Sequence, residues 1–203
     1  MPNVIAINAA SREGFIATQA TSDEMLLESI ATGGRDAMHM LYCRHNVRVY
    51  RFILRIVRDA TVAEDLVSQV FFDVWRTARQ FEGRSQVSTW LLSIARFKAL
   101  TAMRQRRHED IDQDDVLEIV DPADTPETSM DRADTSAILR ACIAKLSPAH
   151  REIINLVYYH EKSVEEAGQI IGIPQSTVKT RMFYARKQLA ELLKNAGVNT
   201  LAA

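Results

Sequence analysis

The sequence contains little glycine, proline or cysteine, with 7, 5 and 2 of these residues in 203. Most glycines and prolines fall at the edges of segments with helical periodicity, and no segment of convincing length alternates apolar and polar residues as a strand does. The two cysteines, Cys43 and Cys142, lie far apart, which excludes a disulfide scaffold and a paired-cysteine metal motif. We expect both to be small buried residues. The composition predicts an all-α protein.

Long apolar runs are also missing from the sequence. No window approaches the ~18 uninterrupted apolar residues of a membrane-spanning helix. The opening Met1-Pro2-Asn3 lacks the basic residues of a signal peptide. We therefore expect a cytoplasmic protein without membrane insertion. A chain that is 47% hydrophobic and 25% charged is long enough for one broad domain or two small ones.

The net charge of −1 conceals an uneven distribution along the chain. Residues 1–108 carry a net charge of +5, residues 109–134 carry −10, and residues 135–203 carry +4. The two basic blocks predict two modules that bind polyanions. The acidic segment has two prolines, no aromatic residue and little helical period, so we predict a flexible linker at 108–134.

The first basic block predicts a domain of four helices over residues 22–107. Capping boxes, in which Ser or Thr is followed three residues later by Glu, are expected at 21–24 and 61–64. Further helices are expected at about 36–57 and 88–107 because apolar residues recur there at helical spacing. The residues before this block, 1–21, and those at the C-terminus, 195–203, are expected to be flexible tails.

The last helix of this block predicts a nucleic-acid surface. From Gly83 to His108 there are six Lys and Arg residues and no acid, interleaved or flanked by Phe81, Trp90 and Phe97. Cations beside aromatic rings suit single-stranded or distorted nucleic acid, because unstacked bases stack on the rings while the cations neutralise phosphates. The alternative is that Trp90 and Phe97 simply belong to the core.

The second block, residues 135–194, predicts a helix-turn-helix. Ser147 followed by Pro148 is a typical helix start, and residues 163–166 form a third capping box. The short helix that follows ends at Gly172, and a long helix runs from about 175 to 194.

The long final helix has two distinct faces. The spacing of Val178, Met182, Ala185 and Leu189 predicts a face packed on the preceding short helix. A second, exposed face carries Ser176, Lys179, Thr180, Phe183 and Lys187. Short polar groups, an apolar ring and cations are what a recognition helix needs for base edges, thymine methyls and phosphates. The alternative is a solvated amphipathic helix in an interaction bundle.

Two sets of motifs resemble bacterial RNA polymerase sigma factors. The first set resembles domain 2 of these factors and consists of Ala63-Glu64-Asp65-Leu66-Val67, Val70-Phe71, Val74-Trp75, Phe81, Gly83-Arg84-Ser85, Thr89-Trp90-Leu91 and Ile94-Ala95-Arg96. The second set resembles domain 4 of these factors and consists of Leu146-Ser147-Pro148, Arg151-Glu152, Ser163, Glu165-Glu166, Ile171-Gly172-Ile173-Pro174, Thr177-Val178-Lys179, Arg181 and Ala185-Arg186. Because the two domains occur in the expected order and without others, the chain resembles the extracytoplasmic-function (ECF) group.

This resemblance implies roles for the first block. One set of residues would dock on the clamp helices of the polymerase β′ subunit: Asp65, Leu66, Gln69, Phe72 and Trp75. Another would contact and help to melt the downstream promoter element: Arg84, Ser85, Arg96, Lys98, Arg104 and Arg107. Family members often have Asn and Asp where this chain has Phe97 and Thr101, and Gln-Glu where it has Ser68-Gln69.

The resemblance also implies roles for the second block. It would touch the polymerase β flap and contact the upstream promoter element through Ser176, Thr177, Lys179, Thr180, Arg181, Phe183, Tyr184, Arg186 and Lys187. Among these, Arg181, Arg186 and Lys187 are expected on phosphates. An anti-sigma protein that covers both domains is expected as a regulator, and we expect no metal ion or cofactor.

Two other classes of function are weighed against a sigma factor. A stand-alone helix-turn-helix regulator would use the first block to sense a ligand or dimerise, but no obvious dimer helix is present. An enzyme could use Asp110, Asp112, Asp114 and Asp115 for magnesium, or His39 with Cys43 for another metal. The carboxylates lie in the predicted linker, and the His/Cys pair lacks further ligands, so we do not expect an enzyme.

Overall fold

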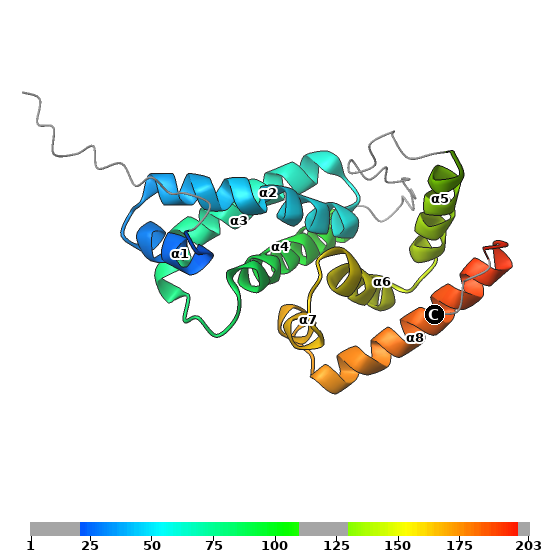
Figure 1. The fold of residues 1–203 in the computed structure, drawn as a ribbon. Helices are drawn as coiled ribbons and strands as arrows, with labels where there is room; N and C mark the ends of the chain where they lie inside the picture. Colours follow the sequence, from blue (N-terminus) through cyan, green and yellow to red (C-terminus); the bar gives the residue numbers. More distant parts are fainter. Residues whose placement is uncertain (1–20, 110–129, 199–203) are drawn as a thin grey trace, which may run out of the picture.

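The structure, a computed structural model, describes residues 21–109 and 130–198, and every regular element within these ranges is a helix. This confirms the predicted all-α class. The first domain contains α1 (Asp23–Ala31), α2 (Arg35–Val57), α3 (Ala60–Thr77), the short η2 (Ala78–Gln80) and α4 (Val87–Glu109). The second contains α5 (Met130–Ala144), α6 (Pro148–Ile154), η3 (Asn155–Tyr159), α7 (Val164–Ile171) and α8 (Gln175–Asn195). Figure 1 shows the two groups side by side.

The helix starts of the first domain differ from the predicted capping boxes. Ser22, not Thr21, caps α1 by accepting a hydrogen bond from the backbone N–H of Met25 at 3.3 Å. Asp59 caps α3 through the N–H of Val62 at 3.0 Å. The predicted box at 61–64 is therefore wrong. The left-handed C-cap of α2 is followed at once by Asp59, so α3 begins one residue later and already contains position 61.

The core of the first domain forms where α2 packs against α1, α3 and α4. Its largest fully buried side chains include Phe52, Leu26, Leu27, Leu41, Ile53, Leu91 and Leu92. Trp90 is partly buried against this core, with its ring 5.2 Å from that of Phe81. Phe97 is instead 73% exposed. The expectation that both cysteines are buried holds for Cys142 but is wrong for Cys43, because its position on α2 faces solvent.

The second domain confirms most of the local signals read from its sequence. Ser147 caps α6 with Pro148 in the first turn. Ser163 and Glu166 form both hydrogen bonds of the capping box at the start of α7. Gly172 ends α7 with φ +78°, a left-handed conformation that a side chain would strain. The chain then turns directly into α8.

The predicted linker overlaps both flanking helices. Helix α4 continues to Glu109 and α5 begins at Met130, so the ends of 108–134 are helical. The part at 110–129 lies outside the described residues, as do 1–20 and 199–203 of the predicted tails.

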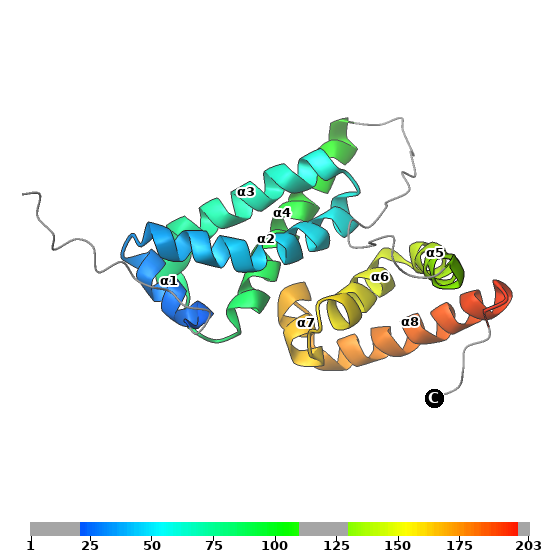
Figure 2. The ribbon, with the colours of Figure 1, turned by 45° about the horizontal axis from the view of Figure 1, so that its top comes forward.

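The two domains share one apolar cluster. Buried side chains of α6, η3, α7 and α8, such as Ile153, Leu156 and Ile170, belong to the same packed cluster as the core of the first domain. A smaller cluster of Leu146, Ile154 and Ala185 joins the remainder of the second domain. Helix α7 packs against α4, and Figure 2 shows the second domain lying along the first.

Candidate nucleic-acid interface

Helices α7 and α8 form the helix-turn-helix that the sequence predicts. Val178 and Met182 are buried in the cluster that contains the side chains of α7, as predicted. Ala185 and the half-buried Leu189 pack instead with Leu146 and Ile154, so only the first part of the predicted face lies on α7. The turn is closed by the N–H groups of Gly172 and Ile173, which donate to the carbonyl oxygen of Gly168 at 2.8 and 3.0 Å. The apolar face therefore fixes which side of α8 remains available.

Gly168 permits the close approach of this turn. A Cβ atom at this position would lie 2.9 Å from the carbonyl oxygen of Ile173, and the two turn hydrogen bonds keep that backbone from moving away. We predict that Gly168→Ala lowers the free energy of unfolding by about 1–3 kcal/mol through overpacking. Urea unfolding followed by circular dichroism would measure the loss. Gln169→Ala, at an exposed position of the same helix, is the matched control and should leave the midpoint almost unchanged.

The second face of α8 is exposed, as predicted. Exposed side chains are Ser176, Lys179, Thr180, Phe183, Tyr184, Arg186 and Lys187, while Thr177 and Arg181 are half-buried. Phe183 is 63% exposed, and its only described ring contact is edge-on with Tyr184 at 5.4 Å. An exposed aromatic pair among cations indicates a surface that meets a partner.

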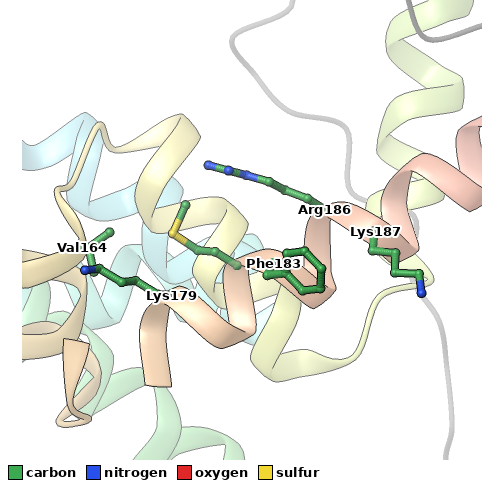
Figure 3. A pocket seen from close by; sticks show the side chains of 6 residues that line it. Val164, Lys179, Phe183, Arg186 and Lys187 are labelled. Atoms are coloured by element: carbon green, nitrogen blue, oxygen red, sulfur yellow. The ribbon is translucent and has the colours of Figure 1, made fainter. Parts of the chain in front are cut away.

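A shallow concavity runs along this face of α8. It is lined by Val164, Lys179, Met182, Phe183, Arg186 and Lys187. Figure 3 shows Lys179 beside Val164 and the other labelled side chains extending from later turns of α8. Its three charged side chains, Lys179, Arg186 and Lys187, are all cationic, whereas Val164, Met182 and Phe183 give it an apolar lining.

Arg186 is held in place by a residue that the sequence analysis missed. Its Nε donates to the hydroxyl oxygen of Tyr158 at 2.7 Å, and its guanidinium carbon lies 5.7 Å from the centre of that ring. Tyr158 lies on η3, a π-helical turn that extends α6. An exposed tyrosine has no distinctive local pattern, so only the position of η3 against α8 identifies this contact.

The candidate downstream residues do not form one open basic patch. Arg96 pairs with Glu152 at 2.7 Å and Lys98 with Asp73 at 2.7 Å. Arg84 is exposed and pairs with its neighbour Glu82 at 2.6 Å, Ser85 is half-buried, and Arg104 is exposed. Arg107 lies on α4, but its side chain is outside the described part of the structure. The carboxylate partners of Arg96 and Lys98 lie on α6 and α3, so the run of cations in the sequence does not reveal these pairs.

Four of the five candidate polymerase contacts line the outer face of α3. Asp65 and Gln69 are exposed, Phe72 is 60% exposed and Trp75 is 37% exposed. Leu66 requires a correction, because it is only 5% exposed and packs in the core, so it cannot contact a partner from this position. The pattern Asp65, Gln69, Phe72 marks one helical face, and Leu66 belongs to the opposite one.

The alternative metal sites find no support in the described ranges. No group of three or more His, Cys, Asp or Glu residues gathers there, and Cys43 Sγ lies 3.8 Å from the ring nitrogens of His39 without a third ligand in the described residues. The candidate magnesium ligands Asp110, Asp112, Asp114 and Asp115 lie outside those ranges. None of the described helices is long and apolar enough to cross a bilayer.

Comparison with known proteins identifies the family. Residues 41–109 match Sigma-70 region 2, and residues 142–191 match Sigma-70, region 4. The RNA polymerase sigma factor CarQ of Myxococcus xanthus is 32% identical over 169 residues, covering 82% of this chain and 95% of that protein. The chain belongs to the ECF sigma factors. This sigma factor therefore directs core RNA polymerase to promoters, and the catalytic step belongs to the polymerase.

Other relatives agree with this assignment. The ECF sigma factor SigK of Mycobacterium ulcerans is 29% identical, over 85% of this chain and 95% of that protein. The solved structure of the sigma factor RpoE from Bartonella quintana, in complex with the anti-sigma factor NepR, is 29% identical with a TM-score of 0.64. That comparison covers 77% of this chain and 96% of the other. The first and second domains correspond to sigma regions 2 and 4.

Proposed function

We propose that this sigma factor binds core polymerase through the outer face of α3 and reads the upstream promoter element through the exposed face of α8. The observation that carries this proposal is that both faces remain uncovered while the opposite faces of the same helices are buried. Exposed aromatic rings are found on each, so each presents an apolar contact within a polar surface. These are the surfaces left available for partners.

The face of α8 divides by chemistry into base contacts and phosphate contacts. Ser176, Thr177, Lys179 and Thr180 lie in its first two turns and supply the donors and acceptors that base edges require. Phe183 offers an apolar contact for a thymine methyl, and Tyr184 lies beside it. The guanidinium groups of Arg181 and Arg186 and the ammonium group of Lys187 would neutralise phosphates.

The face of α3 has the composition of a protein-binding hot spot. Phe72 and Trp75 are aromatic anchors. Gln69 and Asp65 lie about one and two helical turns before Phe72 and provide a polar rim. The guanidinium carbon of Arg76 lies 5.7 Å from the centre of the Phe72 ring, which helps to orient that ring. The clamp helices of β′ are the proposed partner, and the second domain would contact the β flap.

The downstream element would meet the loop before α4 and the exposed part of that helix. Arg84, Ser85 and Arg104 are accessible in the free sigma factor. To contact DNA, Arg96 would have to release the carboxylate of Glu152 and bind a phosphate instead. Lys98 would have to release Asp73 in the same way. Opening a base pair costs a few kcal/mol, which stacking and phosphate contacts can offset.

An anti-sigma protein is the proposed regulator. RpoE of Bartonella quintana, which shares this fold, was solved in complex with the anti-sigma factor NepR. By analogy, a partner of that class would cover the exposed faces of α3 or α8 and keep polymerase or promoter DNA away.

Reconstitution tests the proposed function directly. The purified chain would be added to core RNA polymerase that lacks any sigma factor and incubated with a library of promoter sequences. We expect co-elution with the core enzyme and transcripts that start downstream of one shared pair of sequence elements. Specific duplex binding by the chain alone, without association with the core enzyme, would instead indicate a stand-alone helix-turn-helix regulator.

A further inference from the structure

The basic helix α4 carries a strongly exposed aromatic ring. Phe97 is 73% exposed, compared with 63% for Phe183 and 60% for Phe72. Ala95 and Ala99, two residues before and after it, are fully buried. Because successive helical residues are rotated by about 100°, positions two residues away lie on the opposite side of the helix. Phe97 therefore lies at the middle of the solvent-facing side of α4.

The residues that share this face with Phe97 are mostly polar. Ser93 lies one turn before it, and Thr101 and Arg104 lie one and two turns after it. Ser93 and Thr101 are half-buried, and Arg104 is exposed. Trp90, two turns before Phe97, is packed against the core. Phe97 is thus a single accessible ring within a polar face, unlike the paired aromatic anchors of the α3 face.

The charge of α4 indicates an anionic partner. Residues 83–108 carry six cations and no acid. Carboxylates of other elements do face the helix, but each of the following is paired with one of its cations, at 2.7, 2.7 and 3.0 Å: Asp73 with Lys98, Glu152 with Arg96, and Asp59 with Arg106. An accessible ring on a cationic surface suits single-stranded nucleic acid, because the ring stacks on a base while cations neutralise the phosphates.

Two hydroxyl groups near Phe97 have already donated their hydrogens. Ser93 Oγ donates to the carbonyl oxygen of Thr89 at 2.9 Å, and Thr101 Oγ1 donates to the carbonyl oxygen of Phe97 at 2.8 Å. A hydroxyl has one hydrogen and two lone pairs, so both oxygens remain available only as acceptors. They can receive an N–H group but have no hydrogen left for a carbonyl oxygen.

We propose that Phe97 stacks on one unpaired base of the opened downstream element and that Ser93 and Thr101 select a base with an exocyclic amino group. The proposal rests on the proposed contact of α4 with that element. Adenine and cytosine each offer an amino donor, as does guanine, whereas thymine offers carbonyl oxygens in its place. Thymine would set an acceptor against acceptors. Phe97 thus supplies affinity, and the two hydroxyl oxygens supply selectivity.

Binding of the reconstituted holoenzyme to a forked probe tests the stacking. The probe has a duplex upstream element and a single-stranded downstream element. Phe97→Leu, which stays apolar but loses the ring, should lower the affinity by about 5- to 100-fold. Phe97→Trp keeps an aromatic ring and should retain the affinity. The salt dependence should be the same in all three proteins, because no charge changes. Equal affinity of Phe97→Leu and the parent would overturn the stacking.

A probe that ends before the downstream element is the matched control. The parent, Phe97→Leu and Phe97→Trp should bind it equally, because they differ only at a residue of α4. A loss in Phe97→Leu of the same size on both probes would show a general defect and would also overturn the stacking.

Abasic sites placed one at a time along the single-stranded region locate the base. At one position, loss of the base should weaken binding by the parent about 5- to 100-fold but should hardly affect Phe97→Leu, because ring and base act as a pair. Losses that are equal in the two proteins at every position would contradict the assignment to Phe97.

Base substitution at that position tests the selectivity. Thymine in place of an amino-bearing base should weaken binding by the parent about 2- to 10-fold, the effect expected for one hydrogen bond. The double variant Ser93→Ala with Thr101→Val removes both acceptors, so it should lose this preference while the effect of the abasic site remains. A preference for thymine in the parent, or a preference that survives in the double variant, would overturn the selection.

The proposed function and the stacking can fail separately. A holoenzyme that does not form, or does not bind the duplex upstream element, would contradict the proposed function. Because Phe97 is also exposed in the free chain, the parent and Phe97→Leu can then be compared without polymerase on a single-stranded oligonucleotide of mixed sequence. We expect weaker binding by Phe97→Leu at equal salt concentration. Equal binding in this assay would overturn the stacking independently of the polymerase.

Discussion

Phe72→Ala should lower the affinity of the sigma factor for core RNA polymerase by about 10- to 100-fold. The ring is 60% exposed, lies at the centre of the α3 face and would be fully buried by the β′ clamp helices. Truncation of such an aromatic anchor typically costs 2 kcal/mol or more, which corresponds to about thirtyfold. The affinity can be measured by titrating labelled sigma factor with core enzyme in the absence of DNA.

The matched control for this prediction is Phe97→Ala. This residue undergoes the same chemical change, is 73% exposed and lies on α4 rather than α3. Without DNA it should leave the affinity for core enzyme unchanged, and neither variant should alter the unfolding midpoint by more than about 0.5 kcal/mol, because both side chains are exposed. Equal losses in the two variants would argue against a polymerase surface on α3.

Lys179→Ala and Arg186→Ala should weaken promoter binding in two different ways. Lys179 is a proposed base contact, so its loss should lower the affinity for the preferred upstream sequence by about 1–3 kcal/mol and relax selectivity at one position. Arg186 is a proposed phosphate contact, so its loss should weaken all sequences alike and reduce the salt dependence by about one charge. Holoenzyme binding to a promoter library at several salt concentrations distinguishes the two effects.

Tyr158→Phe refines the second of these predictions. It keeps the ring beneath the Arg186 guanidinium but removes the hydroxyl oxygen that accepts its hydrogen bond. We expect a smaller, sequence-independent loss than in Arg186→Ala with the salt dependence retained, because the cation itself remains. Identical selectivity profiles for Lys179→Ala and Arg186→Ala would refute the division of α8 into base and phosphate contacts.

Local signals predicted much of the fold because they depend on residues close together in the chain. The capping box of Ser163 and Glu166, the start of α6 at Ser147 and the glycine turn at Gly172 each involve groups within a few residues. The predicted capping box at 61–64 was wrong because it also rested on a local pattern alone. Asp59 offers an equally good N-cap, and the length of the turn after α2 decides between the two positions.

The sequence alone determined the helical class, the order of the two domains, the acidic segment between them and the family, because helical periodicity, charge and motif spacing are local properties. The tertiary structure decided which candidate residues are accessible. Leu66 is in the core, Cys43 is exposed, and Arg96 is paired with a carboxylate 56 residues away. The hydrogen bond from Thr89 to Glu166 spans 77 residues. Such contacts depend on how whole helices pack, and no local pattern records that packing.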